Sequence, residues 1–350
     1  MKLIKYKLGD LIRQRRQKND STDLPICGVT RDGFIPPKQQ DADTSLYNVF
    51  YLKDFVFNPA RMELNAIVFN DRYEKAMCSS LYEVFYVHRP EVILPEYLAL
   101  LVKQDWFTRY CEFMGSGSAR EYCRVANISE LEIEVPPIEF QAEMARDNQI
   151  IRDRIELKRR INDNLEATAQ ALYQELFVDN PDISEWKSGY VGDVLQLQRG
   201  HDLPRTEMLG GEYPVAGSTG TIGYHNQYTA ESPVIVMGRS GNIGNPRLYL
   251  CNCWTHNTSL YVKQIFHADP MWTYYMLKNL NYDSFVGGSA VPTLNRNDVH
   301  AYGIAIPPIE LQETFGKKVM KLIQFRETNL SEIAKLDELQ CTVLATISSR

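Results

Sequence analysis

Two glycine-rich stretches combine close backbone approach with side chains that hydrogen-bond to nucleic-acid bases. They are Gly217–Tyr228 (GSTGTIGYHNQY) and Gly238–Arg247 (GRSGNIGNPR). Arginine favours guanine and asparagine favours adenine, whereas hydroxyls and backbone amides more often hold phosphate. These stretches predict a DNA-contacting surface, although ordinary turns between strands have the same composition. The candidate contacts are Ser218, Thr219, His225, Asn226, Arg239, Ser240, Asn242 and Arg247.

The N-terminal part of the chain offers a second, different set of candidates. Met1–Lys18 holds seven Lys or Arg against one acid, and Arg31–Gln40 (RDGFIPPKQQ) adds further donors. The alternative for the basic run is the solvated face of a helix. A Gly-Ser-Ala loop further on is flanked by two more polar residues. The candidates are Arg13, Arg15, Arg16, Arg31, Lys38, Gln39 and Gln40, together with Ser116 and Arg120.

Motifs for catalysis are absent from the sequence. It contains no GxxxxGK[ST] phosphate loop, no HExxH and no GxSxG. Cys251, Cys253 and His256 lack a fourth ligand at the spacing of a zinc site, so reduced thiols are expected. Gly238–Gly244 resembles a nucleotide-binding loop only loosely, because it precedes a strand-like run and not a helix. The sequence therefore predicts a binding protein without a catalytic centre, metal or cofactor.

Composition is that of a soluble globular protein. Of 350 residues, 44% are hydrophobic and 23% charged, which allows two domains, each with its own core. No run approaches the roughly 18 apolar residues of a membrane span, and no signal peptide opens the chain, so a cytoplasmic location is expected. The net charge of −6 argues mildly against nucleic-acid binding, but the basic N-terminal run softens that argument.

An internal repeat organises the whole chain. Pro-Pro-Ile-Glu occurs at 136–139 and again at 307–310, within VPPIEFQ and IPPIELQ. Gly117-Ser118-Ala119 and Gly288-Ser289-Ala290 match at the same offset of 171 positions. Ile133 and Ile304 also match at this offset, and three matches in one register indicate a tandem duplication.

Each half is expected to be a mixed α/β body followed by a long helix. The expected strands are rich in aromatic and β-branched residues and lie at Leu46–Phe57, Leu81–Val87, Pro233–Met237 and Leu248–Leu250. Shorter helices are expected at Pro95–Phe107 and Pro270–Leu280.

The two long helices are expected at Ile138–Phe177 and Ile309–Ile347. Apolar residues recur about every seven positions in both, which is the seam of a helix that packs lengthwise on another. Both seams carry one polar residue, which either fixes the register or reaches solvent. The short linker Asp179–Gly189 favours antiparallel pairing. The seam positions are Met144, Ile151, Lys158, Leu165 and Leu172, and Phe315, Leu322, Asn329, Leu336 and Val343.

This order of body, Pro-Pro hinge and helix, given twice, resembles the specificity subunit of type I restriction–modification systems. The paired hinges carry the resemblance, together with YPVAGSTGTIGYHNQY (Tyr213–Tyr228) and VIVMGRSGNIGNP (Val234–Pro246). The first body lacks the GSTG block, so its contacts are placed less securely.

The resemblance implies a fold and a set of partners. The fold would be two α+β (mixed α/β) target-recognition domains separated by a pair of antiparallel coiled-coil helices. The target-recognition domains would span residues 1–137 and 181–308, and the long helices residues 138–180 and 309–350. The protein would read a bipartite double-stranded DNA target and dock two methyltransferase subunits on its helices. It would also assemble with restriction and translocase subunits, and no membrane would be involved. S-adenosylmethionine, ATP and Mg²⁺ would belong to those partners.

Two other functions fit the residues. One is a coiled-coil scaffold whose bodies bind protein or carbohydrate. The other is a DNA-modifying enzyme whose active site has no familiar motif.

Overall fold

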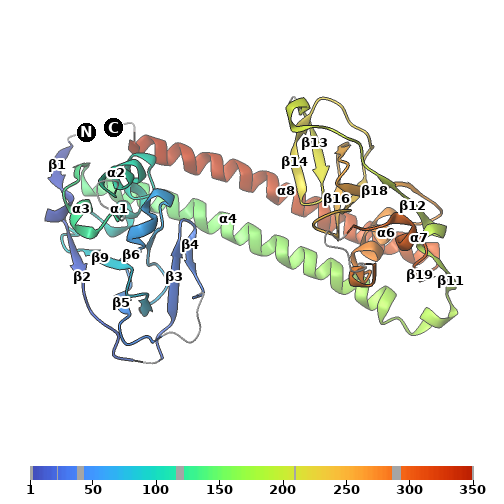
Figure 1. Cartoon of the computed structure of the whole chain (residues 1–350), viewed down its shortest axis with the longest axis horizontal. Helices are drawn as coiled ribbons and strands as arrows, with labels where there is room; N and C mark the ends of the chain where they lie inside the picture. The colour runs from blue at the N-terminus through green and yellow to red at the C-terminus, as the bar shows by residue number, and fades with distance from the viewer. Residues whose placement is uncertain are drawn as a thin grey trace. The chain divides into compact units, whose positions relative to one another are not determined.

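The computed structural model describes residues 3–21, 23–37, 43–115, 122–208, 210–285 and 293–348. The chain divides into two compact units, Met1–Leu157 with Glu332–Arg350, and Lys158–Ser331. Each unit contains one body and a part of each long helix, α4 (Ile138–Tyr173) and α8 (Ile309–Ser348), labelled in Figure 1. Among the described residues, no helix is long and apolar enough to cross a membrane.

The first body consists of two four-stranded sheets, a strand pair and three short helices. The sheet orders are β2-β9-β6-β7 and β4-β3-β8-β5, and β1 pairs with β10. The strands are β1 (Ile4–Lys7), β2 (Ile12–Arg15), β3 (Ile26–Thr30), β4 (Gly33–Ile35), β5 (Asn48–Tyr51), β6 (Phe55–Phe57), β7 (Ile67–Phe69), β8 (Lys75–Cys78), β9 (Glu83–Val87) and β10 (Glu132–Val135). The helices are α1 (Pro95–Leu101), α2 (Asp105–Gly115) and α3 (Val125–Ser129).

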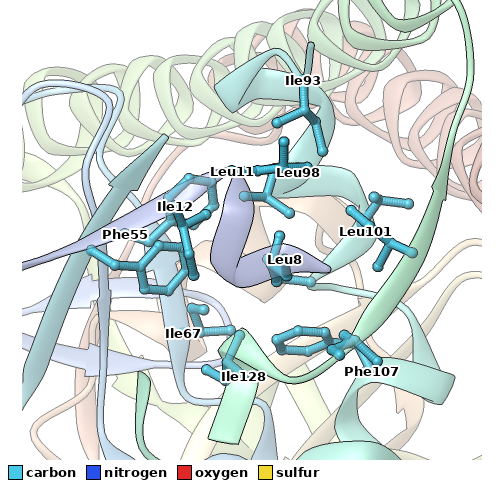
Figure 2. Packing of buried hydrophobic residues seen from close by; sticks show 14 of the residues in the cluster. Leu8, Leu11, Ile12, Phe55, Ile67, Ile93, Leu98, Leu101, Phe107 and Ile128 are labelled. Carbon is cyan, nitrogen blue, oxygen red and sulfur yellow. The ribbon is translucent and has the colours of Figure 1, made fainter. Parts of the chain in front are cut away.

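Strand β6 lies between two hydrophobic clusters of the first body. Phe55 and Phe57 pack into the cluster drawn in Figure 2, while Val56 points into a second cluster on the other face. Phe55 stacks on Phe85 of β9 with ring centroids 4.8 Å apart. Burial on both faces explains why every residue of this strand is apolar.

Two expectations for the first body were wrong. The basic N-terminal run is no helix: β2 pairs with β9, so that Arg13 lies opposite Tyr86. The helix expected at Pro95–Phe107 is broken into α1 and α2. The break is stabilised by the buried Asn65, whose amide donates to the carbonyl oxygen of Val102 at 2.8 Å, just past the end of α1.

The second body has the same general construction. The sheet orders are β12-β18-β15-β16 and β14-β13-β17, and β11 pairs with β19. The strands are β11 (Lys187–Tyr190), β12 (Leu195–Arg199), β13 (Tyr213–Gly217), β14 (Gly220–His225), β15 (Val234–Gly238), β16 (Gly244–Tyr249), β17 (Trp254–Thr255), β18 (Ser259–Ile265) and β19 (Gly303–Ile306). The helices are α5 (Val191–Val194), α6 (Pro270–Lys278) and α7 (Arg296–His300).

The repeated Pro-Pro-Ile-Glu segments have a similar environment in both units. The strand before each Pro-Pro pairs antiparallel with the strand that opens the body, Ile4 opposite Val135 and Lys187 opposite Ile306. Just after the first opening strand, β1, a Cβ on Gly9 would lie 2.9 Å from Ser129 Cβ, so the backbone approaches α3 too closely for a larger residue.

The glutamine that follows each Pro-Pro-Ile-Glu is buried and fastens the long helix to its body. Gln141 donates to the Pro136 carbonyl at 2.8 Å and accepts from the amide of Leu94, the residue before α1. Gln312 donates to the Pro307 carbonyl at 2.8 Å and accepts from the amide of Asp269, the residue before α6. The repeated word is therefore a joint between helix and body.

The long helices pair antiparallel within each unit, as expected. In the first unit, Asn148 of α4 accepts from Gln340 of α8 at 2.9 Å, and Arg154 pairs with Glu332 at 3.5 Å. Residues later in α4 thus contact residues earlier in α8, so the two helices run antiparallel. All ten seam positions are buried or half-buried. Helix α4 ends four residues before the expected Phe177, in a π-helical turn at Gln174–Val178.

The polar seam residues bond to each other. In the second unit, Lys158 Nζ donates to Asn329 Oδ1 at 3.0 Å, and Asn329 Nδ2 donates to Asn162 Oδ1 at 2.9 Å. Asn329 is only 1% exposed, so it does not reach solvent. Because a buried amide is satisfied only when the helices are aligned in this way, the group favours one register.

Replacing Asn329 by alanine is expected to lower the free energy of unfolding by about 1–3 kcal/mol, because the buried Asn162 amide loses its Asn329 partner. Urea unfolding followed by circular dichroism measures the loss. Gln324→Ala, at an exposed position of the same helix, serves as the control. Equal stability of the two variants would contradict the assignment.

Candidate nucleic-acid interface

The two glycine-rich stretches of the second body form adjoining turns. One joins β13 to β14 and the other joins β15 to β16, and Asn242 Nδ2 donates to the Ser218 carbonyl at 3.3 Å. A Cβ on Gly238 would lie 1.5 Å from the Asn242 carbonyl oxygen, so only glycine allows this close approach. Gly220 has φ +119° and lies against the Arg247 guanidinium. The two turns therefore lie against each other.

Most of the candidates in the two glycine-rich stretches are accessible. Thr219, Asn226 and Arg247 are exposed, and Ser218, Arg239, Ser240 and Asn242 are half-buried. His225 differs, since it is only 7% exposed and packs edge-on against Trp254 with ring centroids 5.1 Å apart. The structure places His225 in the core of the body, where it supports the β14 end and does not face solvent.

Arg239 belongs to a cluster of three arginines that come from distant parts of the sequence. Arg199 ends β12, Arg239 follows β15 and Arg296 begins α7, and together they line a cavity of about 390 Å³, here called the arginine cavity. The Arg239 backbone is fixed on both sides, by a bond to the Thr258 carbonyl at 3.0 Å and one from the Leu294 amide at 2.7 Å. Among the described residues that line the cavity, none is acidic.

Sequence reasoning missed Arg199 and Arg296. Each is an isolated arginine outside the glycine-rich stretches, and only the pairing of β12 with β18 and of β18 with β15 brings Arg199 near Arg239. No local signal in the sequence reports that strand order. A cavity with three guanidinium groups and no carboxylate is chemically suited to an anion such as phosphate.

In the first body, Arg15 has a partner inside the protein. Its guanidinium donates to both carboxylate oxygens of the buried Asp54, at 2.6 and 3.0 Å, between the rings of Tyr51 and Tyr86. Burial raises the pKa of Asp54, although the bonds from Arg15 lower it in part. Burial lowers the pKa of Arg15, but the pairing with Asp54 outweighs this effect, so that the pKa of Arg15 is raised overall. The two short bonds show an ionised pair, which occupies Arg15 structurally.

The other first-body candidates are spread out. Arg13 donates to the Gly9 and Ile12 carbonyls, and Arg16 donates to Gln14 at 2.9 Å beside a cavity of about 210 Å³ that Lys18 also lines. Arg31 is exposed and lines a separate cavity. Outside the described residues lie Lys38, Gln39, Gln40, Ser116 and Arg120, together with both Gly-Ser-Ala loops.

The cysteines form no metal site in the part of the chain that the structure describes. No group of three or more His, Cys, Asp or Glu side chains there could hold an ion. All seven thiols are unpaired, with Cys253 buried and Cys251 exposed.

Comparison with known proteins identifies the family. The family model for the type I restriction modification DNA specificity domain matches residues 5–167 and 183–340. The chain belongs to this family. Each match covers one body together with most of the long helix that follows it, in agreement with the duplication. The two specificity domains thus account for nearly the whole chain.

Individual relatives are distant from these specificity domains. The HindI specificity subunit of Haemophilus influenzae is 27% identical over 125 residues, 35% of this chain. The MjaIX specificity subunit of Methanocaldococcus jannaschii is 26% identical over 132 residues, 33% of this chain. These alignments span only 27% and 31% of the two relatives' own lengths.

A solved structure shares the fold over nearly the full length. The crystal structure of the type I restriction–modification system S subunit from M. genitalium matches with a TM-score of 0.69 and 16% identity, covering 99% of this chain and 96% of that one. This likeness confirms the expected architecture of two specificity domains with long helices.

Proposed function

We propose that the chain recognises a bipartite DNA target as the non-catalytic specificity subunit of a type I restriction–modification complex. Membership of the specificity-domain family, with two domains in one chain, carries the proposal. The arginine cavity beside the glycine-rich turns supports it, because it supplies the cationic and hydrogen-bonding groups that DNA recognition needs.

The second body divides these tasks between its residues. Arg199 and Arg296 are exposed, so they suit phosphate groups, whose contacts position a protein on DNA. Arg239 is half-buried with a fixed backbone, and Asn242 is held at the neighbouring turn. Side chains held in this way suit base edges, where a bidentate arginine selects guanine.

A DNA-binding experiment on the assembled complex tests the proposal. The target is found by sequencing the methylated adenines of the host genome, and fluorescence anisotropy compares that duplex with one whose half-sites are scrambled. We expect tighter binding to the target, and affinity that falls steeply with salt as counterions are released. A protein- or carbohydrate-binding scaffold would show neither, and equal affinity for both duplexes would reject target recognition.

Methyltransferase docking on the long helices is the second part of the proposal. In the first unit, Ile150 and Leu157 of α4 are 59% and 56% exposed and lie seven residues apart, so they share one helix face. In the second unit, Phe325 and Leu330 of α8 are also exposed. Large apolar side chains on a helix surface suit contact with partner helices. S-adenosylmethionine, ATP and Mg²⁺ would be bound by the partner subunits.

Changing Ile150 and Leu157 together to aspartate is expected to abolish co-purification of the methyltransferase subunit, because two charges would enter an apolar interface. The melting temperature should stay unchanged, since both side chains are exposed. Leu81→Asp, at an exposed apolar residue of the first body, is the matched control. Unaltered co-purification of the double variant would contradict docking on this face. Aspartate at the half-buried Leu165 and Leu336 would test helix pairing instead.

A further inference from the structure

The first unit contains a larger cavity, in which Arg31 is the one lining residue that was also a candidate for DNA contact. Its volume is about 520 Å³, within the range of small-molecule sites. It lies between the β3–β4 turn, α1 and the first-unit parts of α4 and α8. The groups that line it fall into three kinds: an apolar surface, a pair of amides and a set of cations.

The apolar surface and the amides suit a flat heterocycle. Val68, Leu100 and Leu344 contribute aliphatic side chains. The buried Asn148 accepts from Gln340 Nε2 at 2.9 Å, and this bond uses one donor and one acceptor of the pair. This bond does not use the Asn148 amide nitrogen or the Gln340 carbonyl oxygen, which offer a donor and an acceptor, the combination that the edge of an adenine ring matches.

The cations suit a phosphate. Arg31, Lys103, Arg146 and Arg152 line the cavity against two acids, Asp32 and Glu96. One acid and two arginines are already paired: Glu96 with Lys53 at 3.0 Å, Arg152 with Asp71 at 3.4 Å and, more loosely, Arg146 with Asp147 at 3.9 Å. The lining therefore keeps an excess of positive charge.

Lys103 is held at the cavity by the backbone. Its ammonium donates to the carbonyl oxygens of Arg31 and Ile67, both at 2.7 Å, which leaves one of its three hydrogens for a ligand. Burial and the charges of Arg31 and Arg152 lower the pKa of Lys103 to about 8. A bound anion would favour the charged form and raise this pKa, so binding and protonation support each other.

We propose that this cavity binds a mononucleotide, with the ring on the apolar surface, its edge at Asn148 and Gln340, and its phosphate among Lys103 and the arginines. The assignment is independent of DNA recognition by the specificity domains. The cavity has room for one nucleotide. A simple ion would contact only the cations, whereas a mononucleotide would also contact the apolar surface and the two amides.

Isothermal titration calorimetry of the full-length chain tests the proposal with adenosine 5′-monophosphate, adenosine and inorganic phosphate. We expect the monophosphate to bind, and each fragment to bind at least about tenfold more weakly. Arg146→Ala should weaken monophosphate binding by about tenfold or more, the effect of one charge-assisted hydrogen bond. Arg146 is exposed, so the variant should remain folded. Arg154→Ala, on the same helix but outside the cavity, should bind like the unaltered chain.

The pH provides an independent readout. Affinity should fall as the pH is raised from 7 through 8 to 9, because Lys103 loses its proton in the free cavity. The proposal is overturned if the monophosphate does not bind at millimolar concentration, or if phosphate alone binds as tightly. Equal losses in Arg146→Ala and Arg154→Ala would also overturn it.

Discussion

Replacing Arg239 by alanine is expected to weaken binding of the assembled complex to its target DNA by about 5- to 150-fold, the effect of 1–3 kcal/mol. The reason is geometric. Arg239 is the one residue that belongs to both a glycine-rich turn and the arginine cavity, and its backbone is fixed by two hydrogen bonds. Anisotropy with the target duplex measures the change, and methylation of the same duplex should fall in parallel while the subunits still co-purify.

The dependence on salt and sequence separates the two roles open to Arg239. If it reads a base, the variant tolerates substitution at one base pair and keeps its salt dependence. If it holds a phosphate, binding weakens uniformly and the slope against salt falls by about one. Arg160→Ala, at an exposed position of α4, is the control. Full target affinity and methylation in the Arg239 variant would show that this residue does not contact DNA.

Arg15→Ala is expected to destabilise the first unit by about 3 kcal/mol, although the same residue was a candidate for DNA contact from its place in the basic run. The substitution leaves the Asp54 carboxylate buried, with the Tyr51 amide still donating to it at 2.8 Å but with both guanidinium bonds gone. A buried charge without its partner is strongly destabilising. Urea unfolding measures the loss, and Arg16→Ala, at an exposed neighbour, should cost little.

The pH dependence of this variant follows from the pKa of Asp54. Burial already raises that pKa, and removal of Arg15 removes a group that lowers it. With a folded-state pKa above the unfolded one, the folded protein binds the proton more tightly, so stability falls as the pH rises through the folded pKa. The deficit of Arg15→Ala should therefore be smaller at acidic pH than at neutral pH. If the loss of stability does not change with pH, the buried charge of Asp54 is not its cause.

The long helices and the duplication were predictable because their signals are local or literally repeated. A seven-residue apolar pattern depends only on helix geometry, and α8 begins at the expected Ile309 and ends within one residue of the expected Ile347. Only four strand segments were expected, and one of them, Leu46–Phe57, is divided into β5 and β6. The order of the strands was not predicted, since β12-β18-β15-β16 joins segments far apart in the chain. The broken helix at Val102 depended on a side-chain bond from Asn65, which no pattern reports.

The candidate site was predictable only in part, for the same reason. The glycine-rich stretches are continuous in sequence, so Arg239 and Asn242 could be named as candidates from composition alone. Arg199 and Arg296 were not, because sheet order and not sequence brings them to Arg239. Composition also made candidates of two residues that have partners inside the protein. Arg15 donates to the buried Asp54, and His225 is buried against Trp254. Residue type indicates what a side chain can bind, while burial and existing partners decide whether it is available.

The buried glutamines at the two joints have a consequence for how such a chain can diversify. Gln141 and Gln312 bond backbone atoms, namely the carbonyls of Pro136, Pro307 and Val92 and the amides of Leu94 and Asp269. These hydrogen bonds therefore require only the backbone of a helix start at that point, whereas the packing around them also involves side chains of the body, such as Tyr275 against Phe315. We therefore expect that a body which keeps this backbone and the apolar contacts can be exchanged as a cassette, cut between its opening strand and the Pro-Pro-Ile-Glu segment, on an unchanged pair of helices.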